Sequence, residues 1–78
     1  MTKYNIGDQV RIKSAKELKE LRYLGHDITS EMIECGGEIV IVWYIVPKSL
    51  WINPLMPEYK VRGGLGWTWY ENLLEPIE

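Results

Sequence analysis

One uninterrupted apolar run, residues 39–46, constrains the fold of this chain more than any other feature. It reads Ile-Val-Ile-Val-Trp-Tyr-Ile-Val, follows Gly36-Gly37 and Glu38, and is stopped by Pro47. Every residue in it is β-branched or aromatic, a composition that loses side-chain freedom in a helix and packs well on a pleated sheet. Because successive side chains of a strand alternate between its faces, the run predicts a buried strand covered on both faces.

The rest of the chain predicts short elements that wrap around this strand. Alternating apolar and polar residues, separated by glycine and proline turns, indicate four further strands. Tyr59 and Val61 are expected to face the core. From the next strand either Trp67 and Trp69 or Thr68 and Tyr70 would join them; the period does not choose between these sets, and we favour Trp69 inside. The expected strands are 9–13, 39–46, 59–62, 67–70 and 74–77, with a 3₁₀ turn at 71–73.

A helix is predicted in the first long connection. Ser14 is at an N-cap position and Glu17 follows three residues later, which is the pattern of a capping box, while Gly25 is a C-terminal stop. The helix is expected over 15–24, and a single further turn over 31–35. The apolar residues expected to pack inward from these two segments are Ala15, Leu18, Leu21, Leu24, Met32 and Ile33.

Length and composition narrow the class of protein. The 78 residues are enough for one domain, 1–78, and the single Cys35 cannot form an intramolecular disulfide, which favours a reducing compartment such as the cytoplasm. The N-terminus has no apolar targeting segment and no apolar run is long enough to span a bilayer. The net charge of −2 gives the whole chain no attraction for nucleic acid.

The residues that could carry chemistry each have a simpler interpretation. His26 is the only histidine and lies where a helix is expected to end, and Cys35 lies in an apolar turn where it would be a small buried hydrophobe. The glutamates Glu31, Glu34 and Glu38 cluster in sequence, but a metal site would need His, Cys or Asp at chelating spacing and a defined loop, so a solvated acidic rim is expected. We therefore expect no enzyme, no catalytic residue, no metal site and no cofactor.

The segment 48–57 has the least regular sequence. It combines prolines, which restrict the backbone, with large apolar side chains, and it is too broken for a regular strand. An exposed loop of this kind would be a protein-binding site, whereas a loop folded back would be a lid on one end of the barrel. The candidate partner-binding residues are Leu50, Trp51, Ile52, Leu55 and Met56.

A second binding surface is also possible. Basic residues occupy outward positions on two expected strands, and Trp67 or Tyr70 would lie nearby. Cations interleaved with aromatic rings suit single-stranded nucleic acid, although ordinary solvated strand faces have the same pattern. The candidate nucleic-acid-binding residues are Arg11, Lys13, Lys60 and Arg62.

Four short motifs, taken in order, resemble those of one group of proteins. They are Tyr4-x-Ile6-Gly7-Asp8-x-Val10-x-Ile12, Met32-x4-Gly37 ahead of Glu38-Ile39-Val40-Ile41, Tyr59-x-Val61, and Trp69-x3-Leu73-Leu74-Glu75-Pro76. The chain thereby resembles small SH3-like barrel proteins of phages and prophages. The resemblance implies a mainly β, five-stranded SH3-like barrel with one helix in the first long connection. It carries over no catalytic residue, and the chain departs from the group by its enlarged segment 50–57.

These observations together predict a non-enzymatic protein-binding module. Its partner would be a host or phage protein, and it could act sterically as an inhibitor or modulator of a host or competing enzyme in the host cell cytoplasm. The alternative is a nucleic-acid-binding barrel that uses its basic strand face. No membrane association is expected, and the sequence leaves the oligomeric state and the identity of the partner open.

Overall fold

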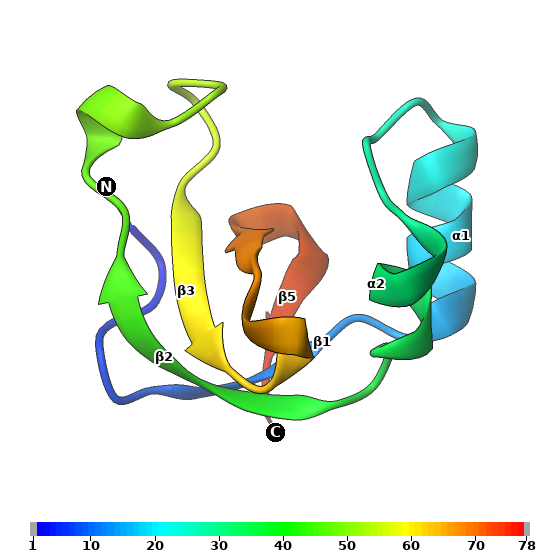
Figure 1. Ribbon diagram of the computed structural model, residues 1–78, viewed down its shortest axis with the longest axis horizontal. Coiled ribbons are helices and arrows are strands. Elements are labelled where there is room, and N and C mark those ends of the chain that lie inside the picture. The colour runs from blue at the N-terminus through cyan, green and yellow to red at the C-terminus, as the bar shows by residue number, and fades with distance from the viewer. Residues whose placement is uncertain (1, 78) are drawn as a thin grey trace.

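The computed structural model describes residues 2–77, which form one five-stranded antiparallel sheet and two α-helices (Figure 1). The chain is therefore a small, mainly β domain, as the sequence predicts. Short 3₁₀ turns lie at Lys48–Leu50, Gly64–Gly66 and Glu71–Leu73. The other elements are β1 (Gln9–Ile12), α1 (Ala15–Tyr23), α2 (Ser30–Glu34), β2 (Ile39–Ile45), β3 (Glu58–Arg62), β4 (Thr68–Tyr70) and β5 (Leu74–Pro76).

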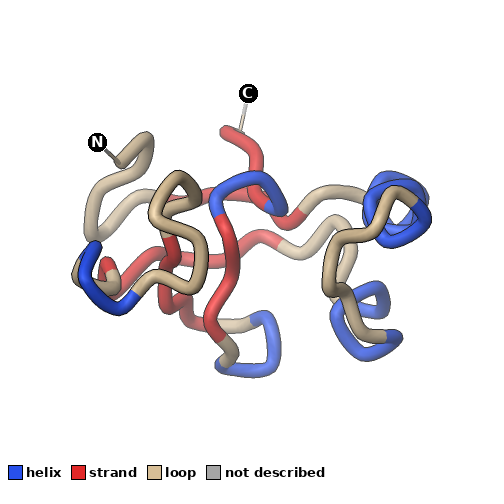
Figure 2. The backbone as a smooth tube through the Cα atoms, turned by 90° about the horizontal axis from the view of Figure 1, so that it is seen from above, coloured by secondary structure: helices blue, strands red, loops and turns tan. Residues whose placement is uncertain are grey.

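The strands follow the order β4-β3-β2-β1-β5, and each neighbouring pair is antiparallel. The edge strands β4 and β5 do not pair with each other anywhere in residues 2–77, so the barrel closure predicted from the sequence is not found. Figure 1 shows the long, curved β2 passing below the other strands, and Figure 2 shows both helices together beyond one end of the sheet.

Helix α1 begins at the predicted capping box. The Ser14 hydroxyl accepts the Glu17 N–H at 3.2 Å, and a Glu17 carboxylate oxygen accepts the Ser14 N–H at 3.3 Å. Leu18 is buried and Leu21 is half-buried, but Leu24 is exposed, so the predicted apolar stripe is wrong in its last position. The reason is that the helix ends at Tyr23 and Leu24 lies in the turn behind it.

The central strand β2 buries only one of its faces. Val40 and Val42 point into the core, whereas Ile39, Ile41 and Trp43 stay exposed on the outer face. The prediction that both faces are covered is therefore wrong. The two helices pack beyond the end of the sheet, and this leaves the outer face of β2 to solvent.

A β-bulge at Trp43 changes the alternation of β2. Val42 pairs with Val61 and the next paired residue is Tyr44, opposite Lys60, so Trp43 is the extra residue. Tyr44 consequently lies exposed like Trp43, and Ile45 turns inward to pair with the buried Tyr59.

The core lies between the inner faces of the strands and the two helices. Trp69, Tyr59 and Val61 are buried, as the sequence predicts. The Trp69 indole N–H donates to the Gly64 carbonyl at 3.0 Å, which satisfies the one polar group of this ring. Met32 and Ile33 of α2 are also buried.

Tyr59 connects the core to the N-terminal segment. Its hydroxyl donates to the Glu71 carboxylate and accepts the N–H groups of Lys3 and Tyr4 at 3.1 and 3.2 Å. Burial disfavours the charged phenolate, and the bond to Glu71 acts in the same direction, so the pKa of Tyr59 is raised to about 12.

We expect the free energy of unfolding to fall as the pH rises from about 10 to about 12. The unfolded chain releases a tyrosine proton near the ordinary pKa of ~10, whereas folded Tyr59 keeps its proton up to about pH 12. Its contribution to stability is therefore complete below pH ~10 and disappears across this window. Denaturant titrations at a series of pH values measure the loss. A Tyr59→Phe variant should lose less stability over the same window, and equal slopes for the two proteins would contradict this account.

Candidate functional site

The enlarged segment 47–57 joins β2 to β3 and exposes three large aliphatic side chains. Leu50 is 67% exposed, Ile52 80% and Leu55 87%. Isolated apolar residues on a surface are ordinary, but here three of them are exposed within six positions of one loop. We call Leu50, Ile52 and Leu55 the apolar loop edge.

Hydrogen bonds hold the loop in this conformation. The Trp51 indole N–H donates to the Val46 carbonyl at 2.7 Å, the Ile52 N–H donates to a Glu58 carboxylate oxygen at 2.7 Å, and the Leu55 N–H donates to the Asn53 side-chain oxygen at 2.9 Å. Trp51 is half-buried and anchors the loop, and Met56 is half-buried as well. Ile52 and Leu55 do not fold back over the core, so the lid arrangement is not the one observed.

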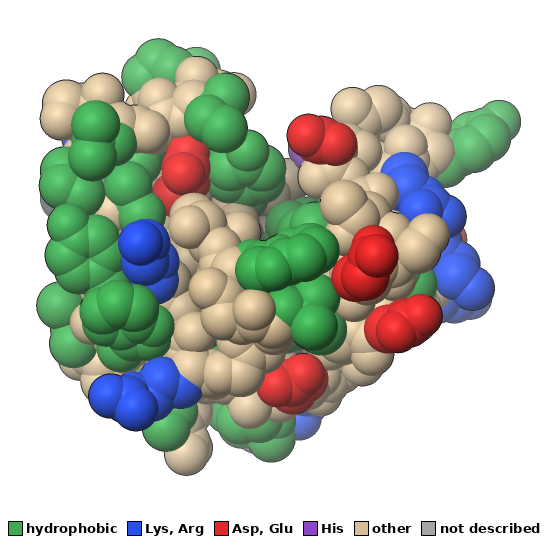
Figure 3. Space-filling model, in the orientation of Figure 1, with side chains coloured by type: hydrophobic (Ala, Val, Ile, Leu, Met, Phe, Trp, Pro, Cys, Tyr) green, Lys and Arg blue, Asp and Glu red, His purple; other side chains and the backbone are tan. Residues whose placement is uncertain are grey.

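A groove opens between this loop and the segment that joins the helices. Figure 3 shows the hollow at the top of the molecule, between the loop side and the helical side. Its larger part has a volume of about 340 Å³, and a smaller hollow of about 150 Å³ shares Ile52 and Tyr70 with it. We call the larger part the acidic groove; its walls include Asp27, Thr29, Met32, Ile52, Glu58, Trp67 and Tyr70.

The acidic groove carries negative charge, and the one ion pair found in residues 2–77 lies elsewhere. Glu58 is only 6% exposed, and no Lys, Arg or His nitrogen within residues 2–77 lies within ion-pair distance of it. Asp27 lines the same groove. Burial raises the pKa of Tyr70, and the nearby charges of Glu58 and Asp27 raise it further. The groove therefore suits a group that is positively charged and rich in hydrogen-bond donors.

The sequence-based reasoning missed Glu58. Glutamate is ordinarily solvated, and at sequence level it is one more polar residue before an alternating strand. The only signal was its place directly after Pro57, where the loop re-enters the sheet. In the structure the same carboxylate fixes the loop through Ile52 and lines the groove.

His26 and Cys35 do not form a catalytic pair. His26 is exposed, and its Nδ1 lies 3.4 Å from the Asn72 side-chain nitrogen. Cys35 is buried, and that burial, together with the charges of Glu38 and Glu34, raises the pKa of its thiol. A thiol with a raised pKa carries little of the thiolate that nucleophilic attack requires. Asn72 lines the smaller hollow, and its Oδ1 is buried with no hydrogen-bond partner in residues 2–77.

The basic residues of the two strands lie on the outer face of the sheet, on either side of β2. In the strand register Arg11 lies opposite Ile39, Arg62 opposite Ile41 and Lys60 opposite Tyr44. Lys13 follows the end of β1 and is half-buried. The aromatic residues expected beside them, Trp67 and Tyr70, line the acidic groove instead, and Trp43 and Tyr44 take their place.

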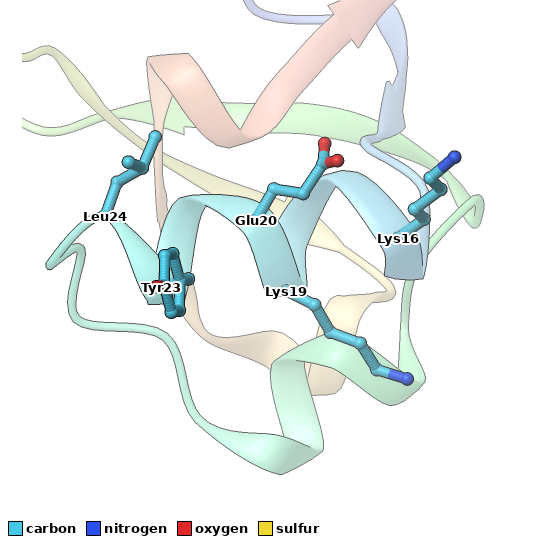
Figure 4. A pocket seen from close by; sticks show the side chains of 5 residues that line it. All are labelled: Lys16, Lys19, Glu20, Tyr23 and Leu24. Carbon is cyan, nitrogen blue, oxygen red and sulfur yellow. The ribbon is translucent and has the colours of Figure 1, made fainter.

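A further exposed surface belongs to helix α1 and its C-terminal cap. Figure 4 shows the side chains of Lys16, Lys19, Glu20, Tyr23 and Leu24 spreading apart from this one helix. Within the described part of the chain no second element lines this hollow. The surface is therefore an open helix face rather than an enclosed site.

Comparison of the chain with protein-family models, with curated proteins and with solved structures finds no match. Over residues 2–77, no group of three or more His, Cys, Asp or Glu side chains is placed to hold a metal ion. Neither of the two helices described has the length and apolarity that a membrane crossing requires.

Proposed function

We propose that this chain is a non-enzymatic protein-binding module that acts sterically, as an inhibitor or modulator of a host or phage enzyme in the host cytoplasm. The observation that carries the proposal is the apolar loop edge, held outward by hydrogen bonds from Trp51, Ile52 and Leu55. Burying such an edge against a partner removes apolar surface from water on both sides.

The fixed conformation of the loop favours a role in binding, because an exposed loop that is already ordered can associate with a partner at a lower entropic cost. Association costs free energy for every loop and side chain that must be ordered, so a loop already ordered in the free protein loses less on binding. Pro47 and Pro54 restrict the backbone further. The half-buried Trp51 has the role of an anchor, and the contact surface is that of the three aliphatic side chains around it.

The acidic groove narrows the chemistry of the partner. It shares Ile52 with the apolar loop edge, so one partner segment can reach both. The unpaired carboxylates of Glu58 and Asp27, beside the rings of Trp67 and Tyr70, favour an arginine or lysine side chain, whose charge the carboxylates and the ring faces stabilise. We therefore propose a partner segment in which a basic residue is flanked by apolar ones.

The SH3-like interpretation of the sheet is part of this proposal. It is supported by the strand order β4-β3-β2-β1-β5, by the long first connection that carries the helices, and by the 3₁₀ turn Glu71–Leu73 directly before β5. A fold of this kind identifies no reaction by itself, and the function therefore rests on the surfaces.

Capture from a nuclease-treated host lysate tests the proposal. We expect a discrete protein to be retained by the unmodified chain and retained roughly tenfold less well by Leu55→Ser, because about 1.4 kcal/mol of contact is lost. Leu24→Ser is the matched control, since it removes a comparably exposed leucine from the turn that follows α1. Both variants should keep their stability within about 0.5 kcal/mol, as surface substitutions do.

A second variant tests the role of the groove. Glu58→Gln keeps an oxygen that can accept the Ile52 N–H but removes the charge, and it should also weaken capture, whereas Glu20→Gln on α1 should not. Equal retention by Leu55→Ser and the unmodified chain would refute the contact through the apolar loop edge. If retention falls with Leu55→Ser but not with Glu58→Gln, the contact through the apolar loop edge is supported and the proposal that the partner inserts a basic residue into the groove is refuted.

A further inference from the structure

The outer face of the sheet is a second surface, separate from the apolar loop edge and the acidic groove. It carries Ile39 and Ile41 of β2 and, at the bulge, Trp43 and Tyr44, which are 47% and 39% exposed. On a regular strand two consecutive residues point to opposite faces. The bulge therefore gives this face an exposed aromatic pair that strict alternation would not allow.

The aromatic pair lies close enough together to act as one platform. The ring centroids of Trp43 and Tyr44 are 5.8 Å apart, and the ring planes meet at 38°. A flat, exposed aromatic ring can stack with any nucleobase, because every nucleobase has a π-face, so stacking of this kind does not depend on nucleotide sequence.

Two cations border this platform. The Lys60 Nζ lies 5.8 Å from the centroid of the Tyr44 ring. Arg62 lies two residues further along β3, where it pairs with Ile41 of β2. No carboxylate in residues 2–77 forms an ion pair with either of them; Arg11 on the neighbouring strand is the residue that pairs, with Glu75 at 3.9 Å. Figure 3 shows Lys and Arg side chains set among hydrophobic ones on the left of the view, over β2 and β3.

We propose that this face binds single-stranded nucleic acid. Bases stack on Trp43 and Tyr44, and the phosphates that flank them pair with Lys60 and Arg62. A duplex fits less well, because its base faces are already stacked and only its phosphates could be reached. A second copy of the chain also fits less well, because stacking two identical faces would bring the same cations together. The net charge of −2 belongs to the whole chain, whereas the charge at this platform is positive.

The test is a titration of labelled oligothymidylate with the full chain, followed by fluorescence anisotropy at several salt concentrations. We expect Lys60→Ala/Arg62→Ala to reduce the slope of log Kobs against log salt by roughly 1.4, which is two phosphate contacts at about 0.7 each for a single strand. Trp43→Ala should weaken binding roughly tenfold through the loss of one stacked base. Lys16→Ala/Lys19→Ala, which removes the same charge from α1, is the matched control and should leave binding unchanged.

The outcomes separate this inference from the proposed function. Leu55→Ser should leave oligothymidylate binding unchanged even where it abolishes capture of a protein partner. The inference is overturned if the unmodified chain does not bind, if the two double variants bind alike, or if the chain dimerises and Trp43→Ala abolishes the dimer. Far-ultraviolet circular dichroism of each variant checks that it is folded. Arg62→Lys keeps the positive charge, so its slope of log Kobs against log salt should stay close to that of the unmodified chain.

Discussion

Replacing Trp69 with alanine is expected to lower the free energy of unfolding by about 3–5 kcal/mol, enough to unfold much of a small domain of ordinary stability. Trp69 is the largest of the fully buried side chains, and its removal leaves a cavity that the surrounding strands can fill only in part. The substitution also leaves the Gly64 carbonyl without its indole donor. Urea titrations of the two proteins measure the difference.

Trp67→Ala is the matched control for this prediction. The two tryptophans are separated by one residue, but Trp67 is 40% exposed at the rim of the acidic groove. Its replacement should lower the free energy of unfolding by clearly less than Trp69→Ala does, since Trp67 is only partly buried whereas Trp69 is fully buried. If Trp67→Ala is the more destabilising of the two, the inward orientation of Trp69 is contradicted.

Replacing Gly36 with alanine is expected to destabilise the domain by roughly 3 kcal/mol, the upper range for overpacking a rigid site. A Cβ at Gly36 would overlap the Ala15 nitrogen and lie 2.8 Å from the Ala15 Cα. Both are backbone atoms at the start of α1, so the clash cannot be relieved by a side-chain rotation. The first turn of the helix must move, and its capping box with it.

Gly37→Ala separates this packing effect from glycine's conformational freedom. Gly37 has a φ of 85°, and a Cβ there would meet nothing within 4 Å. Its replacement should therefore cost only the strain of the left-handed conformation, about 1–2 kcal/mol. Thermal melts rank the two variants, and a Gly36→Ala protein as stable as the unmodified chain would contradict the close approach of the two segments.

Much of the fold follows from patterns within single elements. The capping box predicts the start of α1, and the alternation in 59–62 predicts that Tyr59 and Val61 face the core. Such local signals depend only on neighbouring residues, so they survive in the folded chain.

The sequence-based interpretation failed where distant segments decide the outcome. Ile41 and Trp43 were expected in the core because an apolar run of this length normally belongs to a strand buried on both faces. Covering the second face of β2 requires another layer, and both helices pack beyond the end of the sheet instead. The bulge that turns Tyr44 outward depends on pairing with β3 and has no signature in the run itself. Barrel closure is a separate case: β4 and β5 are close in sequence, but whether these two edge strands pair depends on the twist and curvature of the whole sheet.

The candidate site was predictable in its location and not in its details. Prolines among large apolar residues indicate the loop 48–57, and the aliphatic residues Leu50, Ile52 and Leu55 are exposed there. Trp51 is one of the five predicted contact residues, and the sequence does not indicate that its indole donates to the Val46 carbonyl five residues back. The buried charge of Glu58 depends on the loop folding over it, which residue types alone do not reveal.

The most direct test of the central claim is to map the contact with a captured protein partner by methyl NMR of the isotope-labelled chain. The account predicts that the methyl signals of Leu50, Ile52 and Leu55 shift or broaden first as the partner is added, while that of Leu24 stays in place. Perturbation confined to Leu24 of the α1 surface, or to Ile39 and Ile41 on the outer face of the sheet, with the three loop signals unchanged, would contradict it.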